Sequence, residues 1–168
     1  AFGLTRSTDL TLAEAEDFRE AYFDRFPGVK RYLDRMREKA KEDGYVETLF
    51  GRRRYFPRLK STTNYNVRQR AEREAINAPI QGTAADIMKK AMLEVDQMLQ
   101  QAALQAKILL QVHDELVIEV PEEELDRTVQ TVRQTMEKAF DLAIPLKTEA
   151  RYGENWGELK EYSSREKS

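Results

Sequence analysis

Two apolar runs separated by a short polar interruption constrain the fold of this chain more than any other feature of its sequence. The runs are KILLQV (107–112) and ELVIEV (115–120), and the interruption is centred on His113, Asp114 and Glu115. Leu116, Ile118 and Val120 alternate with Val117 and Glu119 along the second run, which places them on one buried face of a strand. The sequence therefore predicts two antiparallel strands joined by a tight turn that carries ionisable side chains.

The chemistry of that turn points to a cation site. Asn-Gly would make a better two-residue turn than His113-Asp114, although Asp tolerates left-handed backbone geometry. The turn therefore gives up local stability and gains a carboxylate at its tip. Mg²⁺ typically takes one or two protein carboxylates, keeps several waters and completes its coordination with substrate phosphate oxygens. Considered alone, the His-Asp-Glu triplet also fits an ordinary polar turn.

The rest of the chain shows helical and strand patterns in mixed order. Helices are predicted at 12–26 with a capping box at its start, 27–43, 64–78, 80–101 after a disturbance at Pro79, and 122–141. A hairpin is predicted over 45–57, a loop over 58–63, a last strand over 146–151, and a frayed polar tail after it. Because no βαβ rhythm is present, the predicted class is α+β with an antiparallel sheet.

Length and composition exclude several classes of protein. A chain of 168 residues can bury a core without disulfides. The absence of cysteine rules out a thiolate nucleophile, a cysteine zinc site and a disulfide framework. No apolar run approaches the roughly 20 residues that span a bilayer, so we expect a cytoplasmic protein without a membrane partner. The start AFGL lacks an initiator Met, and we interpret the chain as a fragment.

Charge is unevenly distributed, although the net charge is only −2. Carboxylates crowd residues 114–126 without an intervening base. Basic residues crowd residues 51–73 and include Arg52, Arg53, Arg54, Arg58, Lys60, Arg68, Arg70 and Arg73. This separation suits a polyanion on one surface and a cation on another, while solvated surface charge remains the plain alternative.

Several segments together resemble a known family. The matching segments are ETLFGRRRYFP (47–57), REAINAPIQGTAADIMKKAM (73–92), QVHDELVIEVP (111–121) and GENW (153–156), preceded by AFGL at the start. In this order they resemble the C-terminal part of the family A DNA polymerases, the bacterial DNA polymerase I type, over residues 1–157. The resemblance implies that residues 1–74 are the C-terminal part of a helical fingers subdomain, 75–157 an antiparallel palm with the His-Asp-Glu hairpin packed with long helices, and 158–168 a polar tail.

The resemblance also implies roles for the turn. Asp114 would be one of the two catalytic, metal-binding carboxylates. Glu115 would be a supporting catalytic residue that assists either the metal site or the primer end. His113 would contact the primer terminus. The expected cofactor is Mg²⁺ in a two-metal site, completed by a carboxylate that lies outside this chain.

A second group of predicted site residues lies upstream of the turn. Arg73, Asn77 and Gln81 are spaced by four residues, which aligns them along one edge of a helix unless Pro79 interrupts it. Long hydrogen-bonding side chains in such a row can reach the minor groove, where acceptors are nearly the same for every base pair. The resemblance implies this DNA-binding role. From the sequence, any of Arg52, Arg53 and Arg54 could face DNA. They could equally brace the fingers against the palm.

The expected function is template-directed DNA synthesis, with primer–template DNA, dNTP and the upstream part of the same polymerase as partners. The second metal aspartate and the finger-helix lysine of the family are absent, so we expect the chain to be inactive alone. Alternatives are a non-catalytic DNA-binding module derived from such a polymerase and a plain scaffold. A His-Asp phosphohydrolase would need several metal-binding histidines, and the chain has one.

Overall fold

The computed structural model describes residue 5 and residues 8–61 and 64–163. The resembling start AFGL and the last tail residues, 164–168, lie outside the described residues. The chain divides into two compact units, residues 1–81 and 82–168, which are described separately below. The fingers and palm assignments, with their expected division after residue 74, stay predictions. None of the helices in these described ranges combines the length and the apolar composition that a membrane-spanning segment needs.

The first unit begins with two helices whose ends follow local sequence signals. Helix α2 (Leu12–Arg25) starts at the predicted capping box, in which the Thr11 and Glu14 side chains each accept a hydrogen bond from the backbone N–H of the other. Helix α3 (Pro27–Glu42) has its proline in the first turn, where the missing N–H costs no helical bond. Gly44 ends α3 with a φ of 82°, a left-handed conformation that glycine adopts without strain.

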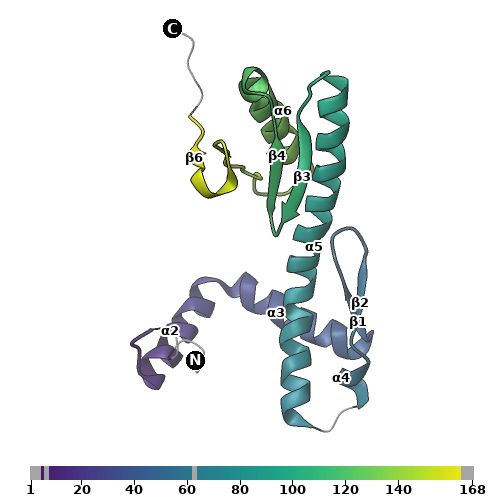
Figure 1. Ribbon diagram of the computed structural model, residues 1–168. Helices are drawn as coiled ribbons and strands as arrows, with labels where there is room; N and C mark the ends of the chain where they lie inside the picture. The colour runs from purple at the N-terminus through teal and green to yellow at the C-terminus, as the bar shows by residue number, and fades with distance from the viewer. Residues whose placement is uncertain (1–4, 6–7, 62–63, 164–168) are drawn as a thin grey trace. The chain divides into compact units, whose positions relative to one another are not determined.

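A short hairpin follows α3 (Figure 1). Strands β1 (Tyr45–Glu47) and β2 (Arg53–Tyr55) pair antiparallel, as predicted. The predicted loop over 58–63 is wrong in part, because helix α4 occupies Pro57–Ser61. Proline at the first helical position already has a helical φ, so Pro57 favours this start. A core cluster joins these elements to the next helix through Ala40, Val46, Phe56, Leu59, Ala75 and Ala78.

Helix α5 (Tyr65–Gln101) continues through Pro79, which corrects the expected disturbance there. Proline inside a helix removes one backbone hydrogen bond and crowds the preceding turn. Pro79 is itself buried, and its neighbour Ala78 is 7% exposed within the core cluster. Burial of this side of α5 offsets the missing hydrogen bond, so the helix does not stop.

The second unit contains the predicted central hairpin. Strands β3 (Lys107–Val112) and β4 (Glu115–Glu119) pair antiparallel, with a register shift between Ile108 and Leu110. The hairpin packs with α5 and with helix α6 (Leu125–Glu137) (Figure 1). The core of this unit consists of Val95, Leu99, Leu104 and Ala106, with Ala102, Ile108, Leu116, Ile118, Val120, Val132 and Met136 packed against it.

Two boundaries in the second unit differ from prediction. The helix expected over 122–141 is divided into a 3-10 turn, η1 (Glu122–Glu124), and the shorter α6. The strand expected over 146–151 is wrong, because β5 comprises only Arg151–Tyr152. Strand β5 needs a partner that lies in the supposed tail, and short-range patterns do not reveal such a partner.

The tail is ordered as far as the structure describes it. Strand β6 (Lys160–Glu161) pairs with β5 after the 3-10 turn η2 (Trp156–Glu158). The Tyr162 hydroxyl donates a hydrogen bond to Asp126 at 2.7 Å. Gly153 sits so close to the backbone that an added Cβ would lie 2.6 Å from the Glu158 carbonyl oxygen. The expectation of a frayed tail is therefore wrong for residues 160–162.

The predicted class, helices mixed with antiparallel strands, is confirmed. The strands of the described residues form three separate two-stranded sheets rather than one larger sheet. In each hairpin, every strand has one edge that pairs with its partner and one edge that does not.

Candidate functional site

The turn between β3 and β4 presents the predicted ionisable residues to solvent. Val112 pairs with Glu115, so His113 and Asp114 alone form the connection between the strands. Both turn residues and Glu115 are exposed. The Gln111 side chain donates a hydrogen bond to the His113 carbonyl oxygen and so closes the turn. The chain thus holds a carboxylate at a solvent-facing tip, where a ligand can reach it.

The strained position of the turn is its first residue. His113 has a φ of 53°, in the left-handed region, whereas Asp114 is not among the described residues whose φ is positive. The sequence favours Asp114 for left-handed geometry, so this expectation is wrong in its residue. Histidine, like Asp and Asn, is enriched at positive φ among non-glycine residues, so it is a tolerable choice. His113 takes the strained conformation, and Asp114 keeps an ordinary one.

The hairpin is anchored on one face and open on the other. Ile108, Leu116 and Ile118 pack against the core of the second unit. Leu109 and Leu110, at the register shift, are 54% and 50% exposed. An antiparallel sheet usually buries one apolar face and exposes a polar one. This hairpin instead exposes leucines in the part of the chain that the structure describes.

The donor set at the turn fits a hard cation only in part. Asp114 and Glu115 supply two carboxylates in succession, which suits Mg²⁺ with water and phosphate completing its coordination. Among the described residues, no group of three or more His, Cys, Asp or Glu side chains is placed to hold a metal. A cation held by Asp114 and Glu115 would therefore need further ligands, such as water or a phosphate oxygen.

The second predicted group lies on α5 in the first unit. Arg73, Asn77 and Gln81 are all exposed, and the helix that carries them is continuous. Because Pro79 does not break α5, the spacing of four keeps the three side chains along one edge.

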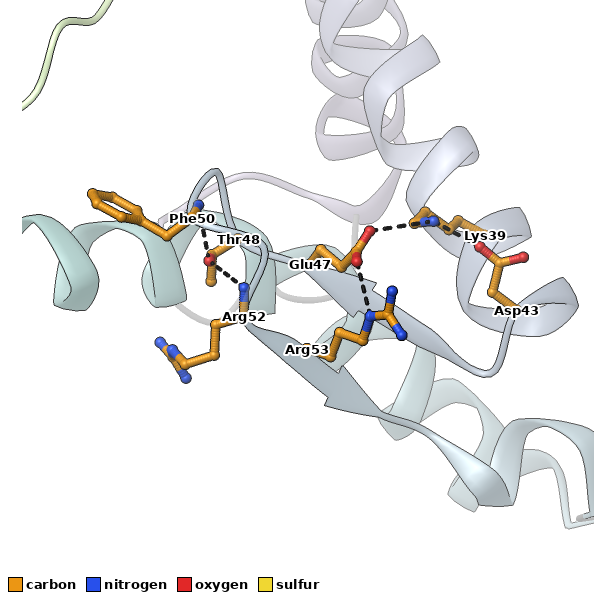
Figure 2. Close-up of polar contacts among 7 residues, drawn as sticks. All are labelled: Lys39, Asp43, Glu47, Thr48, Phe50, Arg52 and Arg53. Atoms are coloured by element: carbon orange, nitrogen blue, oxygen red, sulfur yellow. Dashed lines mark hydrogen bonds and ion pairs between the residues drawn. The ribbon is translucent and has the colours of Figure 1, made fainter.

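Arg53 and Arg54, neighbours on β2, have different surroundings, and Figure 2 shows those of Arg53. The Arg53 Nε lies 2.9 Å from a Glu47 carboxylate oxygen, and its guanidinium lies over the Tyr45 ring, 4.4 Å from the centroid. An Arg54 terminal nitrogen lies 2.9 Å from a Glu74 carboxylate oxygen. Arg53 thus pairs with its own hairpin, and Arg54 pairs with α5.

Thr48 shapes the turn of this hairpin (Figure 2). Its Oγ1 accepts hydrogen bonds from the backbone N–H groups of Phe50 and Arg52, each at 3.2 Å. The backbone N–H of Gly51 donates to the Thr48 carbonyl, and Gly51 has a φ of 77°. These bonds hold the turn in one conformation.

Ion pairs that the sequence did not predict organise the basic region. Glu72 forms ion pairs with Lys41 at 3.1 Å and with Arg68 at 3.3 Å. Burial alone would raise the pKa of Glu72, but Lys41 and Arg68 outweigh it and hold that pKa below its ordinary value. The spacing of four between Arg68 and Glu72 was a signal for one of these pairs. The pairing with α3 had no local signal.

Comparison with known proteins shows which protein family this chain is similar to. The sequence model of DNA polymerase family A matches residues 1–158. DNA polymerase I of Bacillus caldotenax is 49% identical over 159 residues, which are 95% of this chain and 18% of that protein. DNA polymerase I of Geobacillus stearothermophilus is 50% identical over 159 residues, again 95% of this chain and 18% of that protein.

A solved structure of a related polymerase is also similar to this chain. The POL domain of Pol1 from M. smegmatis, in complex with DNA primer-template and dNTP, superimposes with a TM-score of 0.82 and 49% identity. That match covers 87% of this chain and 26% of the other. The chain thus spans 18% of the length of each of these two curated relatives. With a family match that extends over residues 1–158, this chain belongs to DNA polymerase family A.

Proposed function

We propose that this chain is the C-terminal portion of a DNA polymerase I and takes part in template-directed transfer of a nucleotide from dNTP to a primer 3′-OH. The observation that carries the proposal is the exposed Asp114 at the β3–β4 turn of a chain that belongs to this family. The M. smegmatis domain, solved with primer-template and dNTP, supports the same substrates. The proposal includes a cytoplasmic location.

Asp114 is the proposed metal-binding carboxylate, and Glu115 supports it. When bound, a pair of Mg²⁺ ions would activate the primer hydroxyl and stabilise the leaving phosphate oxygens. The role of the chain is to hold the Asp114 carboxylate, exposed to solvent, on a hairpin anchored by Ile108 and Ile118. His113, the adjacent turn residue, is proposed to contact the primer terminus.

Arg73, Asn77 and Gln81 are the proposed contacts to the duplex. Their exposed side chains line one edge of α5 and carry both donors and acceptors. Minor-groove acceptors differ little between base pairs, so such a row can sense correct pairing without reading the sequence. Contacts that do not depend on the base sequence suit DNA synthesis on any template.

The chain needs the upstream part of the polymerase in this proposal. The turn supplies too few ligands for two metals, and no cluster of three or more ligands lies among the described residues. Large apolar side chains are also uncovered in both units, including Phe18 at 56% and Leu109 at 54% exposure. Uncovered apolar surface of this kind is typical of a surface that another protein segment covers. We therefore propose that the chain alone is inactive.

Primer extension with Mg²⁺ tests the proposal. The chain alone, the upstream part alone and the two together are incubated with a primed template and dNTPs. We expect extension only when both parts are present. Extension by the chain alone would contradict the proposed incompleteness. Absence of extension in the mixture, with a folded upstream part and retained DNA binding, would favour a non-catalytic DNA-binding module instead.

A further inference from the structure

The face of α5 that carries Asn77 and Gln81 also carries a carboxylate. Residues three and four positions apart are neighbours on a helix surface. Glu74 is therefore a neighbour of Arg70 on one side and of Asn77 on the other, on the same face as the proposed DNA contacts. An unpaired carboxylate on this face would repel the phosphates of a nucleic acid backbone.

Glu74 is held by two cations from different elements. The Arg54 guanidinium of β2 reaches one carboxylate oxygen at 2.9 Å, and the Arg70 Nε reaches the other at 3.0 Å. Arg54 also lies over the ring of Phe56, 5.4 Å from its centroid, and Phe56 is buried in the core of the first unit. Arg54 is therefore anchored by packing as well as by charge.

Glu72, the other glutamate of this stretch, also pairs with two cations, but on a different side of α5. Glu72 pairs with Lys41 and Arg68 and is turned toward α3. Each carboxylate next to Arg73 is thus matched by two cations. For Glu74, the cation that does not come from its own helix is Arg54.

We propose that Arg54 is a positioning residue for DNA binding: it neutralises Glu74, so that the α5 face that carries Arg73, Asn77 and Gln81 can approach a phosphodiester backbone. This inference rests on the proposed role of Arg73. It also separates the consecutive arginines, because Arg53 pairs with Glu47 and Tyr45 within its own hairpin. Arg53 has no such influence on Glu74.

Equilibrium binding of a labelled primer–template duplex to the complete polymerase, without divalent metal and at fixed salt, tests the inference. Arg54→Ala is expected to weaken binding roughly two- to fivefold, the range of a single exposed charge pair. Glu74→Gln is expected to bind at least as tightly as the parent. The double variant Arg54→Ala/Glu74→Gln should return to the affinity of Glu74→Gln, and Arg54→Lys should retain most of the parent affinity.

Two matched variants make the result specific. Arg53→Ala, one residue away on the same strand, should show no rescue by Glu74→Gln. Arg73→Ala tests the proposed function itself, because unchanged binding in that variant would remove the DNA-facing role of this edge. If Arg73→Ala weakens binding but the double variant stays as weak as Arg54→Ala, then Arg54 contacts phosphate directly and the inference is overturned. Weaker binding by Glu74→Gln than by the parent would also overturn it.

Discussion

Glu137 at the end of α6 accepts two hydrogen bonds from Thr148, one from its backbone N–H at 3.0 Å and one from its hydroxyl at 2.9 Å. These bonds tie the segment after α6 back to the helix. The backbone and hydroxyl bonds from Thr148 hold the pKa of Glu137 below its ordinary value. This contact stabilises the fold above the ordinary glutamate pKa and is lost as the pH falls through the lowered value.

The first prediction concerns this pKa. Removing the hydroxyl with Thr148→Val deletes one of the two hydrogen bonds and should raise the pKa of Glu137 toward its ordinary value. An NMR titration of the Glu137 side-chain carboxyl measures the change. Thr135→Val is the control, because the Thr135 hydroxyl donates to the Thr131 carbonyl within α6. If the pKa of Glu137 is the same in the parent and in Thr148→Val, the hydroxyl of Thr148 does not lower that pKa and the assignment is wrong.

The second prediction concerns the turn of the β1–β2 hairpin. Thr48→Val keeps the shape of the side chain but removes the acceptor of two backbone N–H groups. We expect a loss of about 1–2 kcal/mol in the free energy of unfolding, because these donors lose a protein partner. Thr48→Ser keeps the oxygen and should cost less. Amide hydrogen exchange at Phe50 and Arg52 should be faster in Thr48→Val than in the parent or in Thr48→Ser. Such a difference would show that the lost stability comes from this turn.

The third prediction compares two apolar residues on α5. Val95 is fully buried in the core of the second unit, whereas Leu93 is 70% exposed. Val95→Ala should lower the free energy of unfolding by about 2 kcal/mol, since it removes buried methyl groups and leaves a cavity. Leu93→Ala should change it by less than about 0.5 kcal/mol in the isolated chain. Urea denaturation measures both, and equal losses would refute the assigned burial.

The fourth prediction concerns the catalytic turn. In the complete polymerase, Asp114→Asn should abolish primer extension and leave duplex binding without metal largely intact, because the amide keeps the shape and removes the charge that a metal needs. Glu115→Gln should retain partial extension, because its role is supporting. Loss of duplex binding in Asp114→Asn would instead indicate a structural role for this carboxylate.

The fifth prediction concerns the edge of α5. Gln81→Ala removes a side chain that can both donate and accept hydrogen bonds. We expect the ratio of extension rates from paired and mispaired primer ends to fall, since a minor-groove contact senses pairing geometry. Lys89→Ala, an exposed change farther along the same helix, is the control. An unchanged ratio in Gln81→Ala would exclude this residue from the proposed contacts.

Local signals in the sequence predicted several elements correctly. The capping box at Thr11 and Glu14 starts α2, and the alternation after Asp114 corresponds to β4. Both patterns act over a few residues, where backbone hydrogen bonding and side-chain periodicity are decided locally. The family resemblance was also readable at this level, since the segments that carry it are short and in order.

Other features required the tertiary structure. The passage of α5 through Pro79 depends on burial of that side of the helix, which outweighs a local preference to stop. The pairing of β5 with β6 depends on residues that sequence patterns had assigned to a tail.

The sequence by itself determined which residues are available: a carboxylate at a tight turn, a row of polar side chains at helical spacing, and a basic run. Only the tertiary structure decided how those charges are used. Arg54 and Glu74 are 20 residues apart and meet because β2 and α5 pack around Phe56. An ion pair between distant segments depends on the fold that joins them, so no local pattern specifies it.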